Sequence, residues 1–398
     1  MISMLFAILF GCIAGTITGI TPGIHINLVA TLILASSPIL ATFVSPILIA
    51  IFIISMAITH TFTDFLPSCF LGAPDSDTVL SVLPGHRYLL AGKGYEAVFL
   101  TIIGSVLGLI ITITSIPLMI PFLKSIYTLL RNYIGYILIA VVIFMILREK
   151  SKLWPFIIFL FSGTLGITVF NITILREPLL PMLSGMFGIS TLFLSYKDNV
   201  KIPPQKITYP EIDRSTGIKS IGSSVIVGSI ASFFPGISPA HAAIIATQIV
   251  RKLSTQGFLI LVGSLNTVNM VVSMVTLYTI DKARNGTIVI MSKILESFNL
   301  DLLILLVGAS LIAGLLATII TLKLSKVFSS LITKVNYQKL CITIIIIVTL
   351  VVAMLTGLIG LFVMIVSTLI GIIPAIKGIS RNHLMGCLLL PVILYYIL

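Results

Sequence analysis

The chain has 398 residues, of which 58% are hydrophobic and only 9% are charged, and its mean hydropathy is +1.21. A soluble domain carries roughly 25% charged residues, so this composition excludes an ordinary soluble protein. The apolar runs are long and lack the alternation of barrel strands. We therefore expect an all-α polytopic membrane protein.

The formal net charge is +12, but the basic residues gather in short loops between apolar runs. Lys and Arg concentrate in the cytoplasmic loops of membrane proteins, so the pattern indicates topology and argues against a nucleic-acid partner. It predicts a multi-pass protein of the cell membrane in which the polar stretch 196–218 is a cytoplasmic loop.

The first apolar segment is interrupted by Pro22-Gly23, and a later one by Pro235-Gly236. Proline removes a backbone donor, and irregular backbone at membrane depth survives only when it is buried in protein or lines a watery cavity. A pair of interrupted segments, one in each half, is typical of the central site of a secondary transporter. A simple proline kink at each position is the alternative.

Glycines recur at every fourth position before and within the first break, at Gly11, Gly15, Gly19 and Gly23. This spacing keeps them near one helix face, where small residues let helix backbones approach closely in lipid. Helix packing is the preferred interpretation for Gly11 and Gly15. Packing and ligand contact both stay open for Gly19 and Gly23, which flank the break.

Aligning the two breaks pairs Gly15 with Gly228 and predicts a repeat. Each half continues with a helix, a second apolar segment, a polar irregular stretch and a long helix. If the basic loops share one side of the membrane, the halves are inverted, each with a Pro-Gly-broken helical hairpin. The expected organisation is a first transmembrane repeat (1–122), connecting transmembrane helices (123–195), a cytoplasmic loop (196–218), a second transmembrane repeat (219–322) and additional C-terminal transmembrane helices (323–398).

Four of the five histidines lie near a break or an acidic residue. His25 and His241 follow the breaks, His60 precedes Asp64 by one helical turn, and His86 occurs in Pro84-Gly85-His86-Arg87. Because histidine titrates near neutral pH, these residues are candidates for anion binding or proton coupling. A histidine that is simply satisfied in the core is the alternative for each.

Asp64 lies within an apolar segment, where carboxylates are costly and usually functional. Asp75 and Asp77 occupy a turn-rich stretch and are candidates for binding a coupling cation, with a solvated loop as the alternative. In the second half, Asn266 and Asn269 share a helix face. Arg284 is a candidate anion clamp or, alternatively, a charge at the membrane boundary.

The candidate site residues thus fall into two groups. The substrate-binding candidates are Gly19, Pro22, Gly23, His25, Asn27, Pro235, Gly236, Ser238, His241, Asn266 and Arg284. The ion-coupling candidates are His60, Asp64, Asp75, Asp77 and Asn269. There is no P-loop, GxSxG or HExxH motif, and the four cysteines lack metal-ligand spacing. We therefore expect no enzyme, no metal and no cofactor other than Na⁺ or H⁺ as coupling ion.

Several segments, in this order, resemble the large membrane subunit of tripartite tricarboxylate transporters, the TctA family, and most closely its shorter stand-alone archaeal branch. The matching segments are Gly15–Asn27, Thr59–Ser68, Gly72–Asp75, Leu83–Arg87 leading to Gly92–Gly94, Pro210–Ile212, Pro235-Gly236, Asn266-Thr267 and Lys282–Gly286. The resemblance implies a permease for small carboxylates that uses an ion gradient. It also implies a small membrane subunit and an extracytoplasmic binding protein as partners. The chain departs from the bacterial members at His25, Asn27, Ser238 and Pro239.

Together these features predict a secondary active transporter for a small organic anion, held between the two breaks and driven by a proton or sodium gradient. The resemblance implies that the anion is a carboxylate. Two alternatives stay open. One is a translocase of a lipid phosphate such as polyprenyl phosphate, with Arg87 or Arg284 at the head group. The other is an intramembrane lipid-modifying enzyme that uses His60 and Asp64. The sequence leaves a homo-oligomer open.

Overall fold

In the computed structural model, the regular secondary structure of the described residues is all helical, with no β-strand among them. Seven of its helices are long and apolar enough to cross a membrane. This confirms the predicted all-α polytopic membrane fold. The structure describes residues 2–21, 26–73, 78–130, 132–175, 177–197, 202–233, 238–250, 253–283, 285–295, 297–334 and 337–398.

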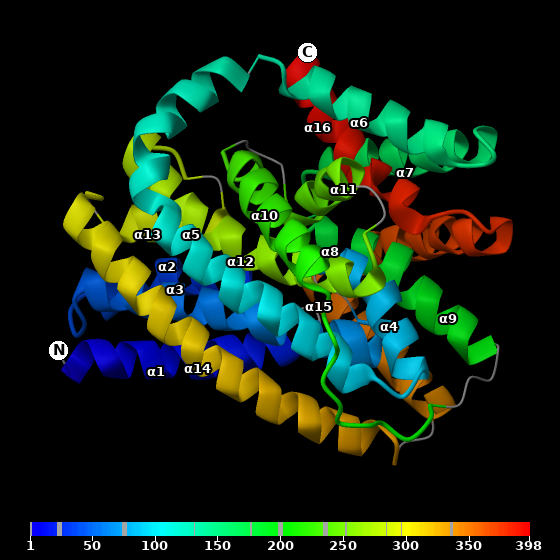
Figure 1. Ribbon diagram of the computed structural model, residues 1–398, viewed down its shortest axis with the longest axis horizontal. Coiled ribbons are helices and arrows are strands. Elements are labelled where there is room, and N and C mark those ends of the chain that lie inside the picture. Colours follow the sequence, from blue (N-terminus) through cyan, green and yellow to red (C-terminus); the bar gives the residue numbers. More distant parts are fainter. Residues whose placement is uncertain are drawn as a thin grey trace.

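The first part of the chain folds into five α-helices and two short turns of other helix types (Figure 1). They are α1 (Ile2–Ile20), α2 (Ile26–Leu40), α3 (Pro46–Thr63), the π-helical η1 (Pro67–Leu71), the 3-10 turn η2 (Val79–Ser81), α4 (Val82–Leu90) and α5 (Gly94–Leu130). Helix α5 runs through Pro117 and Pro121 without ending. Prolines are tolerated inside membrane helices because neighbouring groups satisfy the freed backbone.

Helices α1 and α3 pack closely through the glycine face of α1. A Cβ added at Gly15 would lie 2.3 Å from the Met56 carbonyl oxygen, and one at Gly11 would lie 2.6 Å from that of Phe52. Only hydrogen fits at these positions, so the two backbones touch. The opposite face of α1 exposes large apolar side chains such as Phe6 and Phe10, as expected of a face that meets lipid.

The second part of the chain also forms five α-helices among its described residues. It contains α10 (Arg214–Ala231), α11 (Pro239–Ile249), α12 (Thr255–Ile280), α13 (Gly286–Ile294) and α14 (Leu300–Ile332). Asp213 caps α10 through the backbone N–H of Thr216, and this bond, together with one from the Thr216 hydroxyl, lowers the pKa of Asp213.

The long helix of each part packs on the other part: α5 packs on α12, and α14 packs on α3. Helices α5 and α14 are antiparallel, since Ala97 near the start of α5 shares a hydrophobic cluster with Ile332 at the end of α14, while Leu109 meets Gly314. Gly228, the residue aligned with Gly15, packs on α12 as Gly15 packs on α3. These contacts are those that two inverted halves would make. The inverted repeat itself stays a prediction.

The remaining helices pack beside this bundle, on the right of Figure 1. They are α6 (Ile134–Arg148), α7 (Leu153–Phe170), α8 (Leu179–Leu183), η3 (Ser184–Ile189), α9 (Ser190–Lys197), α15 (Tyr337–Lys377), η4 (Arg381–Met385) and α16 (Gly386–Ile397). Helix α15 contains a kink at Gly357, whose φ of 65° and ψ of −160° are not helical.

The polar segment between the two parts, along residues 203–209, is hydrogen-bonded to the start of α5 and the residues just before it. The Gly94 N–H donates to Gln205 Oε1 (2.9 Å), and the Lys206 N–H donates to the Gly92 carbonyl (2.8 Å). Tyr209 packs edge-on against Tyr95. The linker is thus bound to the bundle along residues 203–209.

Candidate functional site

A polar layer crosses the apolar core where α3 ends beside the middle of α12. The Asn266 side-chain amide donates to Asp64 Oδ2 at 2.8 Å, and the Thr61 and Thr267 hydroxyls lie 3.2 Å apart. All four side chains are buried. We call these residues, with Asn269, the central polar layer. Burying a charge or a polar group is unfavourable unless it is hydrogen-bonded, so this pairing between distant segments is a specific feature of the fold.

The residues that flank both breaks reach this layer. Gly19, near the end of α1, lies against α3, where an added Cβ would be 2.0 Å from Thr63 Oγ1 and 3.1 Å from the Asp64 backbone nitrogen. Ser232, just after α10, donates its hydroxyl hydrogen to Asn269 Oδ1 at 2.9 Å. Because Asn266 and Asn269 are one turn apart on α12, this helix connects the two broken segments.

Further polar contacts extend the layer along α3. His60 Nδ1 lies 3.0 Å from the Thr18 hydroxyl, and the Ser68 hydroxyl donates to the Asp64 carbonyl at 3.0 Å. Ser68 Oγ also lies 2.8 Å from Thr78 Oγ1. The ion-coupling candidates His60 and Asp64 are thus both buried, lie one helical turn apart and each make polar contacts.

Three substrate-binding candidates lie at the starts of helices. The Ser238 N–H donates to His241 Nδ1 at 3.0 Å, so His241 caps α11 in the way that Glu or Gln does in a capping box. Since a backbone N–H can only donate, Nδ1 accepts and a neutral His241 carries its proton on Nε2. Asn27, at the start of α2, accepts from the Thr287 hydroxyl near the start of α13 (2.9 Å).

The structure thus brings Gly19, Asp64, Asn266 and Asn269 together. His60 lies one turn away, and Asn27, Ser238 and His241 make the helix-start contacts just given. The other candidates lie outside the described residues: Pro22, Gly23, His25, Asp75, Asp77, Pro235, Gly236 and Arg284.

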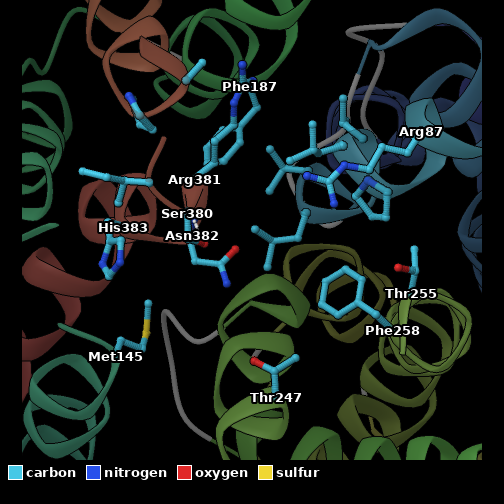
Figure 2. A pocket seen from close by; sticks show the side chains of 18 of the residues that line it. Arg87, Met145, Phe187, Thr247, Thr255, Phe258, Ser380, Arg381, Asn382 and His383 are labelled. Carbon is cyan, nitrogen blue, oxygen red and sulfur yellow. Dashed lines mark hydrogen bonds between the residues drawn. The ribbon is translucent and has the colours of Figure 1, made fainter. Parts of the chain in front are cut away.

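A second feature is a cavity of about 910 Å³ (Figure 2). It lies between the bundle formed by the two parts and the remaining helices that pack beside that bundle. Arg87 enters it from α4, while Arg381 and His383 enter from η4 on the other side. Arg148, at the end of α6, completes three arginines, and Glu149 is the one carboxylate among the described lining residues. We call this space the basic cavity.

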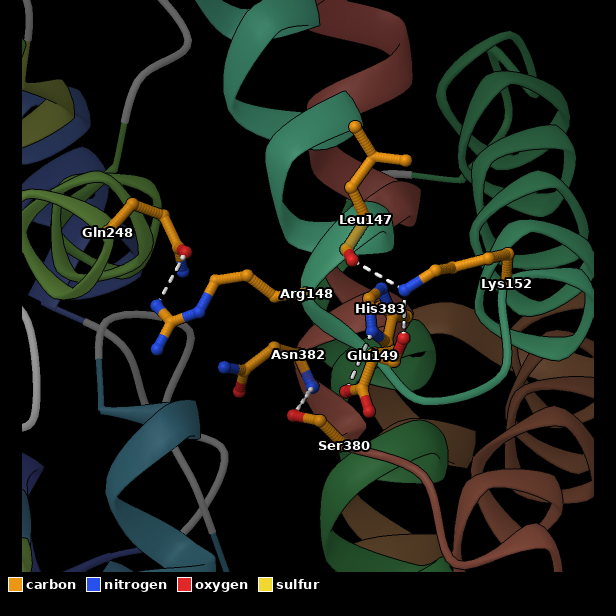
Figure 3. A network of polar contacts seen from close by, with 8 residues as sticks. All are labelled: Leu147, Arg148, Glu149, Lys152, Gln248, Ser380, Asn382 and His383. Carbon is orange, nitrogen blue, oxygen red and sulfur yellow. Dashed lines mark hydrogen bonds and ion pairs between the residues drawn. The ribbon is translucent and has the colours of Figure 1, made fainter.

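Hydrogen bonds tie the walls of the basic cavity together (Figure 3). Arg148 donates to Gln248 Oε1 at 3.2 Å, which joins α6 to the end of α11. His383 Nε2 lies 3.2 Å from Glu149 Oε1. The carboxylate of Glu149 is thus engaged by His383.

Among the described residues, the charged group of Arg381 contacts hydroxyl groups. This partly buried guanidinium donates to the hydroxyls of Thr191 and Ser190 at the start of α9. Within the described part of the chain, neither of the two ion pairs includes Arg87, Arg148 or Arg381. The cavity therefore combines three cations that have no carboxylate partner there.

Sequence reasoning did not single out this cavity. Arg148 and Arg381 were counted only among the charges of basic loops, and His383 is the fifth histidine, far from both breaks. Their meeting depends on contacts between segments more than 200 residues apart, such as that of His383 with Glu149. The scarcity of histidine was the one signal that could have drawn attention to His383.

The helices and the buried polar layer together define a polytopic α-helical membrane protein. The model of the tripartite tricarboxylate transporter TctA family matches residues 5–386, nearly the whole chain. The chain belongs to the TctA family, which is a family of transporters.

An uncharacterized protein of Methanocaldococcus jannaschii is similar to this chain. The two are 34% identical over 411 residues, and the alignment covers 100% of each. No solved structure matches the chain.

Proposed function

We propose that the protein is a secondary active transporter for a small organic anion, a carboxylate, driven by a proton or sodium gradient. Membership of the TctA family supports the transporter class. The observation that carries the proposal is the buried hydrogen bond between Asp64 and Asn266, which joins the two halves beside the end of α1.

In this proposal Asp64 is the coupling residue. Its carboxylate accepts a hydrogen bond from Asn266 when charged, and binding of H⁺ or Na⁺ would change that contact. Asn266 lies on the same helix face as Asn269, which holds Ser232 next to the second break. A change at Asp64 would therefore reach the substrate region through α12.

The substrate would bind between the two Pro-Gly breaks. The helices that follow the breaks, α2 and α11, would direct their N-terminal N–H groups and positive dipole ends toward the anion. Two inverted repeats moving against each other would then give alternating access. We place the protein in the cell membrane with loop 196–218 in the cytoplasm, and we expect the family's small membrane subunit and extracytoplasmic binding protein as candidate partners.

Uptake into proteoliposomes tests this function. Purified protein is reconstituted, and accumulation of labelled di- and tricarboxylates is measured with a proton gradient, a sodium gradient or neither. We expect accumulation that depends on one gradient and exceeds that of empty liposomes. No gradient-dependent uptake across a broad panel of anions would exclude the proposal.

Replacement of Pro22-Gly23 or Pro235-Gly236 by Ala-Ala tests the role of the breaks. We expect uptake to be lost, because a continuous helix would remove the irregular backbone. Pro46→Ala is the matched control, since Pro46 occupies the first turn of α3, where proline is well tolerated. Full uptake by the Ala-Ala variants would reduce the breaks to kinks.

Translocation of a lipid phosphate is the second candidate function. The basic cavity has apolar walls that include Leu80, Phe187 and Phe258, and these would suit a phosphate head group with a lipid tail. A flipping assay with polyprenyl phosphate in vesicles separates the two: movement of the lipid without carboxylate uptake would favour the translocase.

A further inference from the structure

We propose that the basic cavity is a second anion site, separate from the central polar layer, and that it binds soluble organic anions with two or more carboxylates. Its role as a vestibule, where the anion waits on its way to or from the central layer, rests on the proposed transport function. Binding of the anion in the cavity can be measured without transport.

The charges of the cavity carry the first step of the argument. Arg87, Arg148 and Arg381 line one space, while Glu149 is already bound to His383. Arg381 is partly buried among hydroxyls, and a charge removed from water is costly unless an opposite charge compensates it. An anion in the cavity would provide that compensation.

The size and chemistry of the cavity limit the class of ligand that it can bind. A volume of about 910 Å³ lies within the usual range for small-molecule sites. Guanidinium groups bind carboxylates through paired hydrogen bonds, and Arg87 and Arg381 approach from opposite sides (Figure 2). An anion with carboxylates at both ends can meet both guanidinium groups, whereas a monocarboxylate can meet only one.

Two structural connections lead from the cavity to the central polar layer. Helix α11 begins just after the second break and brings Thr247 and Gln248 to the cavity wall. Its 11 residues span about 16 Å at the usual rise. On the other side, Val79 lines the cavity, and the neighbouring Thr78 contacts Ser68, which is bonded to Asp64.

A cysteine-protection experiment tests the site directly. Thr255 lines the cavity at the start of α12 and is exposed, whereas all four native cysteines are buried. In Thr255→Cys protein, the new thiol is therefore the reactive one. The rate of its labelling by a charged methanethiosulfonate reagent is measured in detergent with increasing citrate, with acetate, and with inorganic phosphate.

We expect citrate at about 90% occupancy of the site to slow labelling about tenfold, and acetate at equal ionic strength to have little effect. Arg87→Gln in the Thr255→Cys background should weaken citrate protection roughly 10-fold. The side chain of Arg87 takes part in neither of the ion pairs between described residues, so this variant removes neither of them. Lys150→Gln is the matched control: Lys150 is exposed near Arg148 but does not line the cavity.

Citrate protection that is absent, or equal in the Arg87→Gln and Lys150→Gln backgrounds, would overturn the proposal. Protection by polyprenyl phosphate in mixed micelles but not by citrate would also overturn it and assign the cavity to a lipid phosphate. Adding Asp64→Asn separates this result from the proposed function. Persistent citrate protection in Asp64→Asn shows that the anion site does not depend on coupling. Citrate protection in protein that keeps Asp64 but shows no gradient-dependent uptake leaves the anion site standing while the transport proposal fails.

Discussion

The central polar layer and the basic cavity handle charge in opposite ways. In the layer, a single carboxylate, Asp64, is buried and hydrogen-bonded to the neutral Asn266. In the cavity, three arginines line a volume of about 910 Å³, and two of them, Arg381 and Arg148, donate to hydroxyl and amide oxygens. The layer is closely packed, whereas the cavity is open enough to hold a small molecule.

This difference indicates a division of tasks. A buried carboxylate in a closely packed layer responds strongly to the binding of one small cation, because little water screens it. A wide basic cavity attracts anions from a distance and holds them weakly. We therefore expect changes in the layer to abolish coupling and changes in the cavity to shift anion affinity.

The largest effect is expected from Asp64→Asn. Loss of the charged hydrogen bond and of the coupling charge should reduce gradient-driven uptake by roughly 10- to 100-fold or more. Ser310→Ala is the matched control, since Ser310 is buried and its hydroxyl donates to the Leu306 carbonyl within its own helix. The double variant Asp64→Asn with Asn266→Asp returns a carboxylate to the contact and should recover part of the uptake. Normal gradient-driven uptake in Asp64→Asn would contradict the assignment of coupling to the central polar layer.

Close packing beside the layer is tested by Gly15→Ala. The new methyl group would press on the Met56 backbone, and such overpacking costs about 1–3 kcal/mol. We expect a lower Tm by several degrees, measured by size-exclusion chromatography after heating. Gly222→Ala, with no atom within 4 Å of the added Cβ, should leave the Tm unchanged or raise it slightly. Equal Tm values for the two variants would contradict close packing.

Glu149→Gln tests the charge of the basic cavity, because it removes the one carboxylate among the described lining residues. The amide can keep a hydrogen bond with His383 while the negative charge is lost, so citrate affinity should rise about 2- to 5-fold. Protection of the Thr255→Cys thiol measures this change. Glu211→Gln removes a carboxylate from the linker outside the cavity and should not change it. A weaker affinity in Glu149→Gln would mean that Glu149 helps to bind the ligand.

The smallest effect is expected outside both regions, at Asp213. Hydrogen bonds from Thr216 lower the pKa of this carboxyl group, so its stabilising effect is present above the ordinary aspartate pKa and is lost as the pH falls through the lowered value. Asp213→Ala should lower the Tm slightly at pH 7 and have no effect at very low pH. Asp213→Asn, which keeps a capping oxygen, should stay close to the native Tm. An equal loss in both variants would show that the charge matters more than the cap.

Much of the fold could be predicted because lipid imposes simple rules on sequence. The four-residue spacing predicted helix packing at Gly11 and Gly15, and both residues do pack on α3. The ends of long helices were harder to predict. Helix α14 continues past Lys323 and Lys326 to Ile332, because long basic side chains can extend their charges toward water while the helix goes on.

The site could be predicted only in part. Asp64 and Asn266 both stood out as polar residues in apolar segments, but the sequence assigned them to different roles, and it could not show that they share a hydrogen bond. The basic cavity could not be predicted from the sequence. Lys and Arg are common in the cytoplasmic loops of membrane proteins, so their presence there does not indicate a binding site. Which of them face one another depends on how α4, α6 and η4 pack, and single-segment patterns contain no such information.

The kink in α15 relates this fold to the thickness of its bilayer. A straight helix of 41 residues would be about 60 Å long, twice the hydrocarbon core of about 30 Å. Gly357 divides it into two arms of nearly equal length, each about 30 Å long, which is the length that one crossing needs. Its φ of 65° is strained for any other residue, so a side chain there would favour a single rod too long for the membrane. Replacement of Gly357 would thus create a mismatch between the length of the helix and the thickness of the bilayer, which is unfavourable.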